Sequence, residues 1–243
     1  MQLNRYLALC GLASRRKAND IINEGRVRVN RETVTTLGVQ IDPEKDMVDV
    51  DGKEVVPESA HAYVLLNKPA GTLTSVSDDR GRKTVIDLVG SNKRLFPVGR
   101  LDFDTEGVLL LTDDGDLSYR LMHPKYEIRK VYRAWVKGRM TEEALQTLRT
   151  GVTIEEDVTV SGEVSFLKAY SGKSLVEITI HEGRKRQVKY MLRAVGFHVL
   201  YLERTYFAGL TVSGLKRGEW RELTQQEINR LYHITGLKED QEK

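Results

Sequence analysis

A polar turn framed by glycines, running directly into an apolar segment, is the sequence feature that most constrains the fold. The turn reads Gly-Arg-Leu-Asp-Phe-Asp-Thr-Glu-Gly over 99–107, and Val-Leu-Leu-Leu-Thr follows over 108–112. A short run of large apolar residues bounded by turn residues is typical of a strand buried on both faces. Asp102 is therefore predicted to lie in a short turn at the start of a rigid strand, and a carboxylate held in this way is suited to react.

Two other interpretations of this turn have to be weighed. Its acidic residues nearly reproduce the spacing of an EF-hand calcium loop. Pro97 and Gly99 are incompatible with the incoming helix of that motif, and the segment after Gly107 suits a buried strand, so calcium binding is disfavoured. The second alternative, in which Asp102 and Asp104 only cap the turn, stays open on these residues alone.

Length and cysteine content set the broad class of the protein. The chain has 243 residues, 40% of them hydrophobic, which suits one large domain plus a small one. Cys10 is the sole cysteine, which excludes an internal disulfide and makes a structural zinc site implausible. The first residues contain no apolar run of signal-peptide or membrane-spanning length, so we expect a cytoplasmic protein with no membrane partner.

Charge is distributed unevenly over the first sixty residues. Residues 1–31 contain seven basic and two acidic residues, whereas residues 32–60 contain two basic and eight acidic ones. Such a module is expected to present one basic face to a polyanion, with ordinary surface solvation as the competing explanation. The candidates for RNA contact in this module are Arg5, Arg15, Arg16, Lys17, Arg26 and Arg28.

Apolar spacing in the same region predicts a small helical module with one strand. A helix is expected over 3–10, and Ser14 is expected to cap a second helix that Gly25 ends. Residues 26–30 alternate as a strand with valines inward and arginines outward. The module, assigned to residues 1–60, resembles an S4 RNA-binding domain, and that resemblance implies binding of structured RNA through its backbone and shape.

The region after a linker at 56–61 is predicted to be a larger domain over 61–237. Strands are expected at 63–71, 108–112, 131–136, 174–180 and 198–202, and helices at 117–122, 142–149, 186–195 and 225–232. Because strands outnumber crossover helices, the expected class is α+β, with a largely antiparallel mixed sheet. The charged residues 238–243 are expected to fray.

Two further segments carry side chains suited to a site. Residues 127–136 alternate as a strand, so Lys130, Tyr132 and Ala134 share one face, and Tyr132 is either a core residue or a platform for a base. Arg184, Lys185 and Arg186 stand at the predicted start of a helix, where the macrodipole disfavours cations, which favours phosphate contact over a purely exposed helix start. Lys189 lies on the face of Arg186, within reach of a carboxylate.

Histidines and glycines point to no other chemistry. His123, His181 and His198 have no metal-spaced partner and no nucleophile elbow beside them. The glycines form no Walker or dinucleotide fingerprint. We therefore expect neither a metal nor a nucleotide cofactor.

The combined motifs resemble the RsuA/RluB group of ribosomal pseudouridine synthases over almost the whole chain. The resemblance rests on Gly-Arg-Leu-Asp at 99–102, the run at 104–115, Lys-Val-Tyr at 130–132 and Glu-Gly-Arg-Lys-Arg-Gln-Val-Lys at 182–189. Residues 202–204 and 209–210 are most similar to the large-subunit members, although small-subunit members share most of these motifs. The resemblance implies a catalytic domain of the pseudouridine synthase fold and isomerisation of a specific uridine, in a stem-loop of 23S rRNA or alternatively in 16S rRNA.

The resemblance also implies roles for individual residues. Asp102 is the catalytic carboxylate, acting on the ribose as nucleophile or as base, and Lys189 stands where many relatives carry arginine to keep it ionised. Tyr132 stacks on a uridine flipped out of its helix. Asp104 and Glu106 hold the turn by hydrogen bonds. The remaining RNA contacts are assigned to Arg100, Arg184, Lys185, Arg186 and Arg204.

Two other classes of protein stay open. One is a non-catalytic RNA-binding or ribosome-assembly factor carrying the S4 module, in which the carboxylates are structural. The other is a glycosidase that cleaves the same bond and leaves free uracil. A monomer is the expected oligomeric state.

Overall fold

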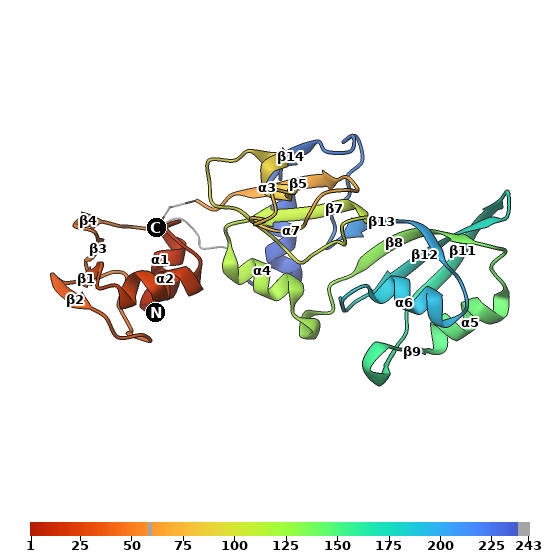
Figure 1. Cartoon of the computed structure of the whole chain (residues 1–243), viewed down its shortest axis with the longest axis horizontal. Helices are drawn as coiled ribbons and strands as arrows, with labels where there is room; N and C mark the ends of the chain where they lie inside the picture. Colours follow the sequence, from red (N-terminus) through yellow and green to blue (C-terminus); the bar gives the residue numbers. More distant parts are fainter. Residues whose placement is uncertain (58–59, 238–243) are drawn as a thin grey trace. The chain divides into compact units, whose positions relative to one another are not determined.

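The computed structural model describes residues 1–57 and 60–237, and the predicted frayed tail at 238–243 lies outside them. The chain divides into two compact units, the first ending at His61 and the second beginning at Ala62 (Figure 1). No helix in the described ranges is long and apolar enough to cross a membrane.

The first unit packs two helices on a small antiparallel sheet. Helices α1 (Leu3–Leu9) and α2 (Arg15–Asn23) were both expected, and Ser14 Oγ caps α2 by accepting a hydrogen bond from the Lys17 amide at 3.2 Å. The sheet has the order β2-β1-β3-β4, with β1 (Val27–Val29), β2 (Glu32–Val34), β3 (Val48–Val50) and β4 (Lys53–Glu54). The fully buried Val27 joins Leu7 and Ala18 in the core, which confirms that the valines face inward.

The second unit is built on a mixed, mostly antiparallel sheet of eight strands. In spatial order these are β11 (Glu163–Tyr170), β12 (Lys173–Ile180), β8 (Lys130–Lys137), β13 (Val199–Phe207), β7 (Glu106–Thr112), β5 (Tyr63–Lys68) and β14 (Trp220–Glu222), and β6 (Phe96–Pro97) pairs with β7. The pairing of β13 with β7 is parallel, and the other pairings are antiparallel. The predicted α+β class is confirmed.

The two faces of this sheet bury two separate cores. Leu109 and Leu111 of β7 point to one core, whereas Val108 and Leu110 point to the other, as the alternation of a strand requires. The surrounding elements are α3 (Val85–Val89), α4 (Gly115–Met122), η1 (Pro124–Tyr126), α5 (Glu142–Thr150), β9 (Val152–Ile154), η2 (Glu155–Asp157), β10 (Val158–Val160), α6 (Gln187–Ala194) and α7 (Gln225–Thr235). Figure 1 shows α5 and α6 beside β11, β12 and β8, with α4 and α7 beside β5 and β7.

Gly107 is required where β7 meets β13. It pairs with Arg204 in the parallel register at φ +102°, and a Cβ built on it would lie 2.1 Å from the Arg204 carbonyl oxygen. No side chain fits at that separation, so only glycine lets the two backbones approach. This close approach fixes the strand that follows the Asp102 turn.

Candidate active site

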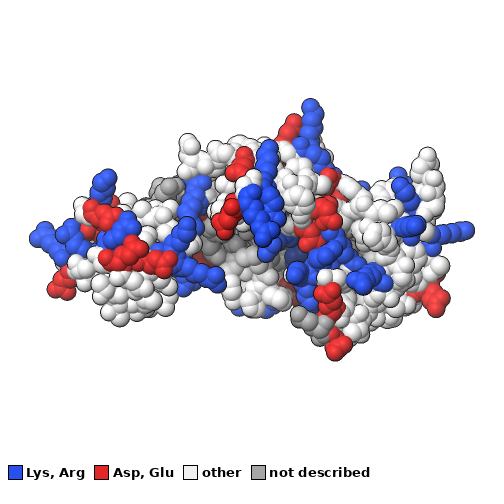
Figure 2. Space-filling view, in the orientation of Figure 1, with Lys and Arg blue, Asp and Glu red and all other residues white. Residues whose placement is uncertain are grey.

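All predicted site residues of the second unit except Lys189, which lines a neighbouring cavity, line one cleft of about 450 Å³. Its walls include Asp102 from the turn before β7, Tyr132 from β8 and the basic residues Arg100, Arg184, Lys185, Arg186 and Arg204. Figure 2 shows lysine and arginine side chains gathered around the hollow between α4 and α6. Residues separated by about a hundred positions in sequence thus meet, as the motif analysis expected.

The backbone of the Asp102 turn is held by a lysine that the sequence analysis did not single out. The ammonium of Lys68, at the end of β5, donates hydrogen bonds to the carbonyl oxygens of Pro69 (3.1 Å), Asp102 (3.1 Å) and Thr105 (2.9 Å). Thr74 Oγ1 donates to the Leu101 carbonyl at 2.8 Å. The turn is therefore fixed from below, and the Asp102 side chain is aimed by a rigid backbone.

Lys68 is fully buried, and burial lowers the pKa of its ammonium to about 8, although Asp104, Glu106 and Asp102 oppose the shift. Four backbone carbonyls accept hydrogen bonds from this buried cation, the fourth being that of Phe103 at 3.5 Å. Since the charge sits beneath three carboxylates, it adds positive potential at the turn.

The Lys189 ammonium on α6 bridges two carboxylates of the turn. Its Nζ lies 2.9 Å from Asp102 Oδ2 and 2.5 Å from Asp104 Oδ1. The side chain of Lys189 is 11% exposed, against 31% for Asp102 and 68% for Asp104, so the cation is shielded on the Asp102 side. The sequence expectation that Lys189 reaches Asp102 agrees with this geometry.

Asp104 and Glu106 do different things, although both were expected only to hold the turn. Burial works to raise the pKa of Asp104, but the hydrogen bond and charge of Lys189 leave it below its ordinary value. Glu106 is the residue that anchors the turn, because it accepts hydrogen bonds from Tyr201 Oη and Arg217 Nε, each at 2.7 Å. Asp104 instead competes with Asp102 for one cation.

Tyr132 is 8% exposed and belongs to the apolar core while also lining the cleft. The predicted alternation along β8 is confirmed, since Lys130, Tyr132 and Ala134 are buried and Arg133 is exposed. Both expectations for this tyrosine therefore hold at once. Its ring packs in the core, and one part of it faces the cleft.

Two buried cations form the floor of the cleft beside Tyr132. Arg204 is 2% exposed, and its Nε donates to the Val108 carbonyl at 2.8 Å, while its Nη2 has no hydrogen-bond partner among the described residues. Lys130 donates to the carbonyls of Ile128 and His181, and burial, aided by the charge of Arg204, lowers its pKa to about 8. Arg204 was expected to contact RNA, and its burial restricts that contact to a group that enters the cleft.

The entrance of the cleft is basic. Arg184, Lys185 and Arg186 are exposed there, and Arg184 lies 3.4 Å from Glu182. Arg186 takes the N-cap position of α6 with a left-handed backbone at φ 55°, and the first turn of α6 contains no acidic residue. A cation in a strained position at a helix start adds nothing to helix stability, which supports the interpretation of an anion-binding entrance.

The first unit differs from the sequence expectation in how its charges are arranged. Arg26 forms a bidentate pair with Asp51, at 2.6 Å for the shortest contact, and Arg28 lies 2.8 Å from Asp49. These partners come from the region of β3, which pairs directly with β1. The acidic segment therefore lies against Arg26 and Arg28 and offsets their charge, and RNA contact by these two arginines stays a prediction.

The other basic candidates of the first unit are placed differently. Arg15, Arg16 and Lys17 are exposed at the start of α2, and Arg15 donates a hydrogen bond to Gln2 at 3.0 Å. Arg5 lies on α1. The positive charge at the start of α2 is therefore less compensated by acidic side chains than the positive charge of Arg28 on β1.

Comparisons with known proteins agree with this geometry. The family model described as RNA pseudouridylate synthase matches residues 62–194, and the S4 domain model matches residues 1–48. The chain belongs to the RNA pseudouridine synthase family and is an isomerase, which sets aside the non-catalytic factor and the glycosidase.

Relatives match along nearly the full length. The chain is 45% identical to ribosomal large subunit pseudouridine synthase B of Bacillus subtilis, over 95% of each chain. It is 44% identical to an uncharacterized RNA pseudouridine synthase of Aquifex aeolicus, covering 98% of this chain and 96% of that protein. A crystal structure of a pseudouridylate synthase superimposes with a TM-score of 0.69 at 31% identity, over 95% of this chain and 99% of that one.

Lys68 and Arg217 are the functional residues that sequence reasoning missed. Lys68 interrupts an apolar strand just before Pro69, and a charge in a fully buried strand is a signal that was available. Arg217 lies in a glycine-rich loop, and its partner Glu106 is 111 positions away in the sequence. No local pattern indicates such a contact.

Proposed function

We propose that this synthase isomerises a uridine of 23S rRNA, with Asp102 as the catalytic carboxylate. The observation that supports the proposal most directly is the Asp102–Lys189 ion pair at 2.9 Å, in which Asp102 lines a cleft that also contains Tyr132 and has a basic entrance. The assignment to the large-subunit RNA is supported by the similarity to the Bacillus subtilis enzyme.

The reaction needs an ionised acid beside the ribose. Asp102 attacks the sugar as a nucleophile or removes the proton from the adjacent C–H, and either role needs its carboxylate form. The glycosidic C–N bond breaks, the uracil rotates, and a C–C bond forms to the same sugar. The ring carbon loses its proton and the freed ring nitrogen gains one, so no cofactor is consumed.

Tyr132 and Arg204 are assigned to the base. The Tyr132 ring supplies a face for stacking, and its hydroxyl can take part in moving the proton from carbon. The free Nη2 of Arg204 provides a donor for a uracil carbonyl or a ribose oxygen inside the cleft. A buried donor that gains its only partner from the substrate favours the bound state.

The target uridine has to leave its helix to reach Asp102. Unstacking costs roughly a few kcal/mol, and phosphate contacts at the entrance offset this cost. Arg100, Arg184, Lys185 and Arg186 are assigned to those contacts. In the first unit we assign RNA contact to the exposed start of α2, in particular to Arg16 and Lys17.

Mapping pseudouridines in both ribosomal RNAs of cells with and without the gene tests the substrate. The proposal predicts that one or more pseudouridines of 23S rRNA disappear when the gene is deleted and return with the wild-type chain. Loss of a site in 16S rRNA alone would assign the enzyme to the small subunit and overturn the proposal.

A further inference from the structure

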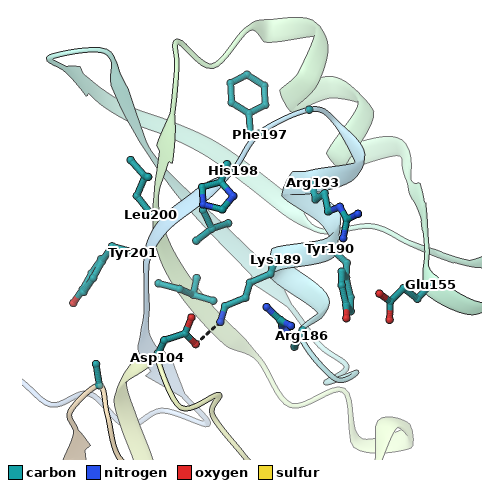
Figure 3. A pocket seen from close by; sticks show the side chains of 14 residues that line it. Asp104, Glu155, Arg186, Lys189, Tyr190, Arg193, Phe197, His198, Leu200 and Tyr201 are labelled. Atoms are coloured by element: carbon teal, nitrogen blue, oxygen red, sulfur yellow. Dashed lines mark hydrogen bonds and ion pairs between the residues drawn. The ribbon is translucent and has the colours of Figure 1, made fainter.

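A second cavity, of about 900 Å³, lies on the far side of Lys189 from the catalytic cleft. It is bounded by α6 on one side and by the strand β13 on the other (Figure 3). Arg186 and Leu202 line both cavities, and Lys189 joins them by pairing with Asp102 in one and Asp104 in the other. We call this second cavity the α6 groove.

The walls of the α6 groove combine unpaired cations with aromatic rings. Arg186 and Arg193 lie on the α6 side, and neither forms an ion pair with any described residue. The rings are those of Tyr190, Phe197 and Tyr201. Figure 3 shows Tyr190 beside Arg193 and Glu155, with Tyr201 on the opposite side of the view.

The two carboxylates of the groove are already occupied. Asp104 is paired with Lys189 at 2.5 Å. The Tyr190 hydroxyl donates a hydrogen bond to Glu155, and this bond, followed by burial, raises the pKa of Tyr190. The guanidinium groups of Arg186 and Arg193 therefore set the local potential.

We infer that the α6 groove binds the nucleotide next to the target uridine. Its phosphate contacts Arg186 and Arg193, and its base stacks on Tyr190 or Phe197, because a cationic track with aromatic platforms is how proteins hold single-stranded RNA. Arg186 lines both cavities, so a chain whose uridine occupies the catalytic cleft passes over Arg186 into the groove. The inference rests on the proposed function, since it takes the catalytic cleft to hold a uridine of RNA.

Arg193→Ala tests the phosphate contact, with Arg139→Ala as a matched control. Both arginines are exposed, and Arg139 lines neither cavity. With an unmodified 23S rRNA transcript and the full chain, Arg193→Ala should raise the KM roughly tenfold with kcat unchanged. The slope of log Kd against log salt should fall by about 0.7, the value for one single-stranded phosphate. Equal behaviour of the two variants would overturn the inference.

Tyr190→Ala tests stacking, with Tyr190→Phe as the conservative control. Removal of a stacking ring should weaken binding of the transcript roughly 5- to 100-fold. Tyr190→Phe keeps the ring and should bind as the wild type does. Matched weakening in both variants would assign the effect to the hydroxyl and its bond to Glu155, and would contradict stacking. Melting temperatures confirm that each variant is folded.

Cross-linking separates this inference from the proposed function. The Asp102→Asn chain is irradiated with 23S transcript in which uridine is replaced by 4-thiouridine, and the linked peptides are identified by mass spectrometry. Links to peptides of the groove from a nucleotide adjacent to a pseudouridine site support the inference. Links confined to the catalytic cleft overturn it, whereas absence of pseudouridine formation by the wild type would overturn the proposed function instead.

Discussion

Ion pairs in the two units use the same chemistry and have different consequences. On β1, Arg28 lies 2.8 Å from Asp49, and the arginine side chain is 45% exposed whereas the carboxylate is 8% exposed. In the second unit the exposures are reversed, because Lys189 is 11% exposed and Asp102, at the edge of a cleft, is 31% exposed. The first pair covers a buried carboxylate with an exposed cation, whereas the second presents its carboxylate where a substrate can reach it. Which partner faces the solvent is therefore the difference between a structural pair and a candidate site.

Loss of Lys189 is expected to have the largest effect on the rate. Lys189→Met leaves Asp102 and Asp104 without the cation that bridges their carboxylates, so the repulsion between the two acids is no longer offset. We expect the rate of pseudouridine formation to fall by roughly 100-fold or more. Single-turnover kinetics on a 23S transcript measure it, and a near-normal rate would show that another cation serves Asp102.

Removal of Lys68 tests whether the turn needs its buried anchor. Lys68→Met leaves the carbonyls of Pro69, Asp102 and Thr105 without their shared donor. Unsatisfied buried groups of this kind cost about 1–3 kcal/mol each. We expect a lower melting temperature together with reduced activity. Unchanged values of both would show that Lys68 is not needed to hold the Asp102 turn.

The pH dependence should separate activity from stability. Lys68 and Lys130 have pKa values of about 8 in the folded chain, against the ordinary value of 10.5. Activity should fall as the pH rises through 8, because Lys68 beneath the Asp102 turn and Lys130 in the cleft both lose their positive charge.

Stability should change in the opposite direction over the same range. Between pH 8 and 10.5 the unfolded chain binds more protons at these lysines than the folded chain does, so their contribution to the free energy of unfolding rises with pH. The difference in melting temperature between the wild type and Lys130→Met, measured across this range, checks the sign. A difference that does not vary with pH would contradict the assignment for Lys130.

The smallest effects on RNA binding are expected in the first unit. Arg28→Ala leaves the buried Asp49 carboxylate without its ion-pair partner, which should lower the free energy of unfolding by roughly 1–3 kcal/mol. Removal of Arg16 and Lys17 together should instead lower the salt slope of RNA binding by roughly 1.5, since neither cation on α2 forms an ion pair within the described part of the chain. Chemical denaturation measures the free energy of unfolding, and filter binding measures the salt slope. A larger change in salt slope for Arg28→Ala than for the loss of Arg16 and Lys17 would contradict this prediction.

Local sequence patterns predicted the elements that carry strong periodicity. The buried strand β7, the helices α2, α4, α5, α6 and α7, and the alternation of β8 all follow from spacing and caps. Short elements such as α3 and β14 were missed, and β13 runs to Phe207 where a strand ending at 202 was expected. Few residues and pairing with distant strands give such elements no periodic signal.

The site was predicted to a similar extent. Motifs identified Asp102, Tyr132 and Lys189, because each lies in a segment whose pattern is distinctive. The pairing of Arg26 with Asp51 and the anchoring of Glu106 by Arg217 could not be read, since both depend on strand register and loop path. The spacing of residues in the sequence also does not show that the Lys189 ammonium pairs with Asp104 as well as with Asp102.

Tritium release from a 23S transcript labelled at carbon 5 of uridine tests the central claim most directly. Asp102→Asn is compared with Asp104→Asn, since both carboxylates lie on one turn and share Lys189. The account predicts no release by Asp102→Asn with RNA binding retained, and clear release by Asp104→Asn. Turnover by Asp102→Asn at the wild-type rate would contradict the assignment of the catalytic carboxylate.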